Sequence, residues 1–169
     1  LTKNISAVVD TTNYDVHLVF IDDAATDQVS YKRWDSGTLT WDSSATLVAD
    51  VADNNDSYVS LSYNTSGTNL YALWIDTSVS DIFYASCTIS TECNLASEWV
   101  AEINWKSAGT NTYVTSNYDG AGRVFAEWTI GAASPYTIGW DIIIVPENLW
   151  LFLALSPLLP LILRKKRIS

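Results

Sequence analysis

Methionine, histidine and basic residues are absent or scarce in this 169-residue chain, and each scarcity limits the structures and partners that the chain can have. There is no methionine, and residues 1–9 lack the basic and then apolar pattern of a secretory signal peptide. An exported protein needs such a signal, so we expect Leu1 to be a cut within a longer or processed chain. The only histidine, His17, cannot build a zinc site without cysteine or carboxylate partners, and we expect it to be a half-buried strand residue.

Basic residues are also few. Four of the nine Lys and Arg form the run Arg164-Lys165-Lys166-Arg167, which leaves five against 19 acidic residues elsewhere. An acidic surface repels phosphates, so nucleic acid is excluded as a partner. Two acidic groups could offer Ca²⁺ oxygen ligands, but they lack the spacing of an EF-hand loop and also fit solvated turns, so no cofactor is assigned. These groups are Asp22, Asp23 and Asp27, and Asp50, Asp53 and Asp56.

What the chain does contain favours strands. Hydrophobic residues make up 48%, with 8 Trp and 9 Tyr, which is too apolar for a disordered chain. Aromatic and β-branched residues fit the pleated, half-buried surface of a sheet. The composition therefore predicts an all-β domain.

A repeat with a period of about 54 residues organises this domain. Phe20, Trp74 and Trp128 share one column of the repeat, within runs that begin near Val16, Leu70 and Val124. The period predicts units at 1–54, 55–108 and 109–145, each with up to four short strands. The expected strands are Ile5–Val9, Val16–Asp22, Gln28–Trp34 and Thr46–Ala49; Tyr58–Tyr63, Leu70–Ile75, Ile82–Cys87 and Trp99–Ile103; and Tyr113–Tyr118, Arg123–Thr129 and Tyr136–Val145.

Four short strands in about 50 residues are typical of a β-propeller blade. Propellers have about four to eight blades, so three units predict part of a larger propeller. The alternative is a small β-sandwich, or a sheet stack completed by other copies. An open blade edge would favour self-assembly in that case.

One segment resembles the Asp-box of sialidase-like propellers, Ser-x-Asp-x-Gly-x-Thr-Trp. It contains Asp35, Gly37, Thr40 and Trp41, with one extra residue before Thr40 and Arg33 in place of the leading Ser. The resemblance implies a propeller whose Asp-box turn faces away from any active site. Sialidase-like enzymes use an arginine cluster, a Tyr–Glu pair and an acid–base Asp. Outside the tail this chain has only Arg33 and Arg123, so no catalytic residue is assigned.

The C-terminal residues 146–169 read as a membrane anchor. Leu149–Leu163 is uncharged and ends at the basic run, and a helix of about 15 residues rises about 22 Å. Trp150 at one interface and snorkelling basic side chains at the other help it to cross. Because basic residues stay on the cytoplasmic side, residues 1–145 are expected outside. The alternative is a buried core helix.

This end resembles the exosortase-type sorting signal of prokaryotic surface proteins, which joins Pro-Glu-Pro, an apolar span and a basic cluster. Here the motif is Pro146-Glu147-Asn148, a departure at its third residue. The resemblance implies cleavage by a sortase-like membrane enzyme, and the alternative is a plain stop-transfer anchor.

Cys87 and Cys93 lie close together in sequence and, outside the cell, predict a disulfide that staples the loop between them. Together these features predict a surface-displayed, membrane-anchored propeller module that binds glycans or proteins or serves as cell-envelope scaffold. The alternative is the C-terminal part of a sialidase-like glycoside hydrolase. A pocket combining Arg123 with Tyr and Glu would favour the enzyme, and a smooth acidic face would favour binding or scaffolding.

Overall fold

The computed structural model describes residues 5–22, 27–48, 56–64, 68–107, 110–120, 122–131 and 133–144. Within these ranges the chain is all-β apart from two short 3₁₀ turns, Ile89–Thr91 and Ala96–Glu98. No helix among these residues has the length and apolar character needed to cross a membrane. The predicted anchor at 146–169, including the Pro146-Glu147-Asn148 motif and the basic run, lies outside the described residues.

The strands form three antiparallel sheets that follow one another along the chain. The first sheet contains β1 (Ile5–Val9), β2 (Val16–Asp22), β3 (Gln28–Asp35) and β4 (Thr40–Trp41), with β5 (Thr46–Leu47) also paired to β3. The second contains β6 (Asp56–Asn64), β7 (Asn69–Asp76), β8 (Asp81–Thr88) and β9 (Ile103–Lys106). The third contains β10 (Asn111–Tyr118), β11 (Arg123–Ile130) and β12 (Thr137–Ile144).

The predicted fourth strand of the first unit, Thr46–Ala49, appears as β5 (Thr46–Leu47), which pairs with β3, while Ala49 lies outside the described residues. The other outermost strands of the first two sheets differ from the prediction. β4 was not predicted, and it forms because a turn at Asp35 returns the chain beside β3. β9 begins at Ile103, where the prediction ended, because the segment before it forms a turn and meets β8 only through a Trp99–Cys87 bridge. The first three strands of every sheet agree with prediction to within about two residues at each end.

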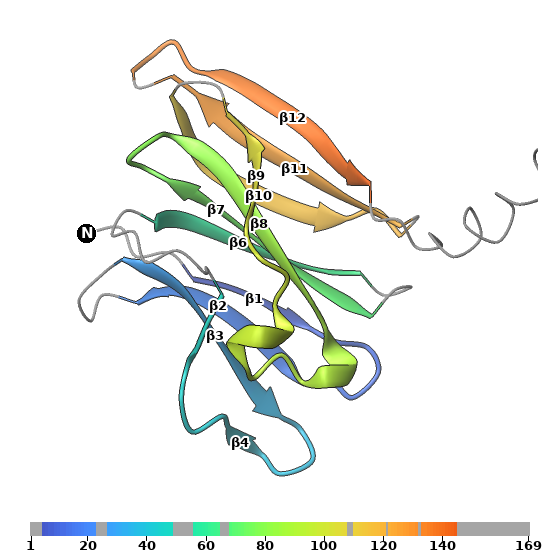
Figure 1. The fold of residues 1–169 in the computed structure, drawn as a ribbon. Coiled ribbons are helices and arrows are strands. Elements are labelled where there is room, and N and C mark those ends of the chain that lie inside the picture. The colour runs from blue at the N-terminus through green and yellow to red at the C-terminus, as the bar shows by residue number, and fades with distance from the viewer. Residues whose placement is uncertain are drawn as a thin grey trace, which may run out of the picture.

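The three sheets stack face to face in chain order (Figure 1). One apolar cluster joins the first and second sheets and includes Val19, Tyr31, Leu61 and Trp74. Another joins the second and third and includes Leu73, Ile75, Val124 and Trp128. Strand β7 is therefore buried on both faces, as expected for a sheet between two others.

Serine side chains hold the first strands of the three sheets against one another. Ser6 Oγ accepts a hydrogen bond from Leu61 N at 3.0 Å, which joins β1 to β6. Ser60 Oγ accepts one from Ser116 N at 2.8 Å, and Ser62 Oγ lies 2.6 Å from Ser116 Oγ, which joins β6 to β10. Small hydroxyl side chains permit this close approach and satisfy backbone groups that have no partner within their own sheet. Adjacent first strands in successive antiparallel sheets give the fold its propeller-like character.

Candidate functional site

Two regions gather polar or aromatic side chains: a buried network at the first sheet and an open face on the third. In the buried network, His17 Nε2 lies 3.2 Å from Asp10 Oδ2, and Nδ1 lies 2.7 Å from the Tyr31 hydroxyl. The geometry suits a neutral imidazole that donates to Asp10 and accepts from Tyr31. His17 is fully buried, whereas the sequence predicted half-burial.

The protonation states of this network are set by burial and by its own hydrogen bonds. Burial lowers the pKa of His17 despite the opposing effect of the Asp10 carboxylate, and it raises the pKa of Tyr31. Burial also acts to raise the pKa of Asp10, but hydrogen bonds from Asn13 N, His17 and Thr12 N outweigh it, so this pKa is lowered. The network is closed and satisfied, which fits a structural role.

Arg33 lies beside this network and is surrounded by carboxylates. Its guanidinium lies 3.6 Å from Asp15 and 3.3 Å from Glu92, with Asp35 and Asp42 near 4 Å. Glu92 belongs to the loop that the Cys87–Cys93 disulfide closes, as predicted. This ion cluster therefore fastens the disulfide loop of the second sheet onto the first. No arginine cluster of the kind that grips a ligand carboxylate is formed here.

The Asp-box-like segment forms the turn between β3 and β4. Asp35 Oδ1 accepts hydrogen bonds from Gly37 N at 2.7 Å and Thr38 N at 3.0 Å, and the bonds from Thr38 and Gly37 lower the Asp35 pKa. Thr40 pairs with Asp35 across the turn, and Trp41 is about half exposed. The Asp35 carboxylate is thus bonded within its own turn, and the turn lies at the opposite end of the stack of sheets from β12 (Figure 1).

The open region is the outer face of the third sheet, the side turned away from the second sheet. Side chains alternate along a strand, so residues between the buried Val124, Ala126 and Trp128 point to this face. The cross-strand register adds neighbours from β10 and β12. We define the outer face as Thr115, Asn117, Phe125, Glu127, Thr129, Ile138 and Trp140.

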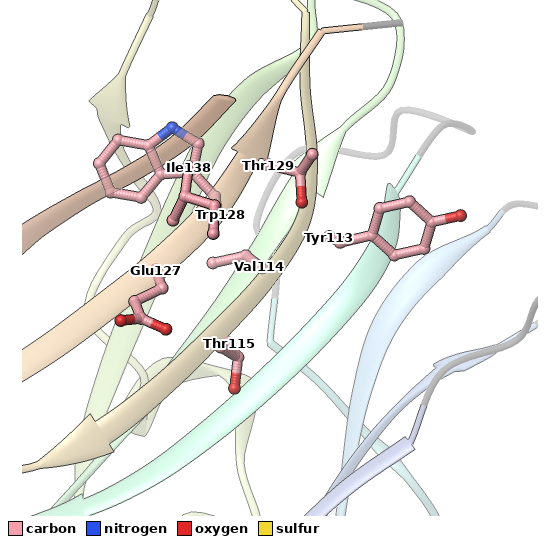
Figure 2. A pocket seen from close by; sticks show the side chains of 7 residues that line it. All are labelled: Tyr113, Val114, Thr115, Glu127, Trp128, Thr129 and Ile138. Atoms are coloured by element: carbon pink, nitrogen blue, oxygen red, sulfur yellow. The ribbon is translucent and has the colours of Figure 1, made fainter. Parts of the chain in front are cut away.

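Two adjoining hollows lie along this face. The larger has a volume of about 300 Å³ and is lined by Tyr113, Val114, Thr115, Glu127, Trp128, Thr129 and Ile138 (Figure 2). The smaller, about 290 Å³, is lined by Thr115, Ser116, Asn117, Phe125 and Glu127. Glu127 and Thr115, from neighbouring strands, border both, while Tyr113 lies on the other side of the larger hollow (Figure 2). Both hollows are open to solvent.

Exposed aromatic and aliphatic groups flank the hollows. Ile138 is 70% exposed, Trp140 63% and Tyr113 58%. Phe125 stacks against Trp140 with ring centroids 6.1 Å apart. Aromatic faces beside carboxylate, hydroxyl and amide groups are the combination that suits a sugar ring, which has apolar faces and a polar rim.

A strained tyrosine recurs at equivalent places in two sheets. Tyr58 and Tyr113 both have left-handed backbone conformations, with φ of 56° and 54°, at bulges in β6 and β10. Their rings lie 4.5 Å apart. A left-handed conformation is unfavourable for a bulky residue and persists only where the surroundings enforce it, often at ligand sites. Two similar segments in the sequence could have revealed this pair: Ser57-Tyr58-Val59-Ser60 and Thr112-Tyr113-Val114-Thr115. They are out of register by one residue in the 54-residue alignment, so the alignment did not match them.

The pocket that would have favoured an enzyme is only partly assembled. Tyr113 and Glu127 line the larger hollow, but Arg123 lies at the opposite end of β11, where it is bonded to Asp119. Within the described part of the chain, no three His, Cys, Asp or Glu side chains gather as a metal site requires. Of the acidic groups considered for Ca²⁺, Asp23, Asp50 and Asp53 lie outside the described residues.

No protein-family model and no curated protein matches this chain by sequence. In structure the chain is similar to an endo-arabinase from Bacteroides thetaiotaomicron, with a TM-score of 0.56 and 12% identity over 83% of this chain and 55% of that one. It is also similar to a point mutant of the NanB sialidase from Streptococcus pneumoniae, with a TM-score of 0.50 and 12% identity over 83% of this chain and 23% of that one. The chain thus spans about half of the first protein and about a quarter of the second. At this identity the similarity concerns the fold, and it supports the propeller-like arrangement of sheets.

Proposed function

We propose that this chain is a propeller-like glycan-binding module whose site is the outer face of the third sheet. The three units form part of a larger propeller-like stack that continues beyond the first sheet and leaves the outer face of the third sheet open. The glycan lies along the two hollows, with Tyr113 and Trp140 providing apolar contacts and Glu127, Thr115 and Thr129 providing polar ones.

The observation that carries the proposal is a change of residue type in two columns of the repeat. Val19 and Leu73 occupy one column and Ile21 and Ile75 the next, and all four are buried against the following sheet. In the third sheet the same columns hold Glu127 and Thr129. A dry apolar contact would leave both polar groups without water, at a cost of about 1–3 kcal/mol for each unsatisfied group. The outer face is therefore built to stay wet, as a binding surface does.

The face of the first sheet that is turned away from the second sheet supports continuation of the propeller on that side. Val16, Leu18 and Phe20 share columns with residues that are buried against the preceding sheet in the second and third units. Here these positions remain apolar, and the neighbouring Ile5 and Val9 on β1 are exposed. Such a face fits the packing of one more antiparallel sheet.

Surface display and tethering complete the proposal and rest on the sequence of residues 146–169. The apolar span anchors the chain with the basic run inside and the β domain outside. Pro146-Glu147-Asn148 marks where a sortase-like enzyme would cut. Intact mass of the protein from its native membrane fraction tests this. A mass that ends near residue 148 indicates processing, one that includes Ser169 indicates a permanent anchor, and recovery only in soluble fractions with the tail intact contradicts tethering.

A sialidase-like glycoside hydrolase is the second candidate. The juxtaposition of Tyr113 and Glu127 in one hollow favours it, while the distant, ion-paired Arg123 does not. Release of a chromogenic leaving group from aryl sialosides or aryl arabinosides by the full chain, lost in Glu127→Gln, would support the enzyme over the binding module.

The direct test is glycan binding by the full chain in a detergent that carries no sugar. Trp140→Ala and Tyr113→Ala should each weaken binding about tenfold or more, because each removes about 1–3 kcal/mol of stacking and burial. Trp41→Ala removes an exposed tryptophan at the far turn and is the matched control. Equal loss in Trp41→Ala, or no glycan bound by the wild type, would contradict the proposal.

A further inference from the structure

The hollows on the outer face carry a single charged group. Glu127 is the one acidic residue among the side chains that line them, and none of those side chains is basic. Its cross-strand neighbours are Thr115 on β10 and Trp140 on β12. Among the described residues no basic side chain forms an ion pair with it. Glu127 therefore leaves the centre of the site with an uncompensated negative charge.

Among the described residues, two cations that lie on or contact the third sheet are committed to other carboxylates. Arg123 begins β11, and its guanidinium is bonded to Asp119. Lys106 on β9 is paired with Asp141, and this hydrogen bond lowers the Asp141 pKa. Asp141 alternates with Trp140 on β12, so this ion pair belongs to the opposite side of the sheet. Neither cation offsets the charge of Glu127.

We infer that the outer face selects uncharged oligosaccharides and discriminates against acidic sugars. This inference rests on the proposed function and adds the class of ligand to it. Hydroxyl groups of a neutral sugar donate hydrogen bonds to the Glu127 carboxylate, and the Thr115 and Thr129 hydroxyls complete the polar rim. A sugar carboxylate at the same place meets a like charge and finds no guanidinium to receive it. The site therefore presents a negative charge to its ligand, whereas an arginine cluster presents positive charge.

The size of the discrimination follows from Coulomb repulsion at a half-exposed site. Two like charges about 6 Å apart, with an effective dielectric constant between those of water and a protein surface, weaken binding by about tenfold. Salt screens such a repulsion over about 10 Å at 0.1 M, so the discrimination should shrink as ionic strength rises.

A matched ligand pair isolates this charge. Trigalacturonic acid and its fully methyl-esterified form differ in the charge of the sugar carboxyls and in the added methyl groups, and of these two effects the charge effect is the one that salt screens. Binding of each ligand to the full chain is measured by titration calorimetry at 50 mM and 500 mM salt. The wild type should bind the ester about tenfold more tightly at low salt. Glu127→Gln, which keeps the shape of the side chain but replaces one acceptor oxygen with a donating amide, should reduce this ratio to nearly one by strengthening binding of the acid. Asp81→Asn removes one negative charge on the second sheet and should leave the ratio unchanged.

The outcomes separate this inference from the proposed function. Equal binding of acid and ester by the wild type, or an unchanged ratio in Glu127→Gln, overturns the selectivity while glycan binding stands. If neither trisaccharide binds, neutral arabinotriose and xylotriose are compared with sialyllactose in the same assay. Preference for sialyllactose there overturns the selectivity, and absence of binding to every one overturns the proposed function together with it.

Discussion

Replacing Gly139 with alanine should destabilise the third sheet, because Trp128 fills the space where a β-carbon would stand. Gly139 pairs with Trp128 across β11 and β12. A β-carbon on Gly139 would lie 2.5 Å from Nε1 and Cε2 of the indole and 2.8 Å from Cζ2. These are separations that real structures do not tolerate, so either the ring or the strand has to move.

The indole has little freedom to move. Trp128 is 8% exposed, and its ring makes an edge-to-face contact with Trp105 at a centroid distance of 5.6 Å. Overpacking of a filled core costs about 1–3 kcal/mol, and we expect Gly139→Ala to fall in the upper half of that range. Part of the cost should also appear as a weaker Trp105–Trp128 contact, which is worth about 0.5–1.5 kcal/mol beyond burial.

Urea denaturation of the full chain measures this loss as a change in midpoint at constant slope. Gly37→Ala is the matched control, because a β-carbon there meets only the Asp35 carboxylate at 3.2 Å in an exposed turn. Combining Gly139→Ala with Trp128→Phe should cost less than the sum of the two single changes, since the smaller ring relieves the clash. Equal stability of Gly139→Ala and Gly37→Ala, or strict additivity in the double variant, would refute the packing argument.

Two further predictions concern the first and second sheets. Replacing Cys87 and Cys93 together with serine should lower the free energy of unfolding by only about 2 kcal/mol, because the closed loop is short. The wild type in reductant should lose the same amount in urea denaturation. Unchanged stability under both treatments would show that the disulfide does not stabilise the fold. Burial lowers the pKa of His17, so below about pH 6.5 the unfolded chain binds a proton that the folded chain does not. The free energy of unfolding should therefore fall as the pH drops from 7.5 to 5.5, by at most about 1.4 kcal/mol per pH unit. His17→Gln should remove that slope, and a slope that persists in this variant would show that another group causes it.

Much of the fold was accessible from the sequence because buried columns impose a period. The second strand of each sheet, such as β2 or β7, is buried on one or both faces. Its apolar run recurs along the chain at a spacing of 54 residues. The disulfide was accessible because Cys87 and Cys93 lie six residues apart in sequence, close enough to close one loop.

The outer strands were less accessible because they contribute little to the buried columns. β4 has two residues, both exposed, and β9 begins with two exposed residues, so their hydrophobic signal is weak. Their positions depend on turn geometry at Asp35 and on the disulfide loop, which no periodic pattern records.

The candidate site was missed for a different reason. Its defining residues, Glu127 and Thr129, are visible only as departures from columns whose burial the structure reveals. The bulges at Tyr58 and Tyr113 add one residue to a strand and so displace the alignment at the place that matters.

Hydrogen exchange of the full chain with and without a bound glycan tests whether the glycan binds on the third sheet. Backbone amides of β10, β11 and β12 should gain protection when the ligand is present, while those of β1 to β5 should not change. Protection centred on the first sheet, or on the turn at Asp35, would place the site elsewhere and contradict the account.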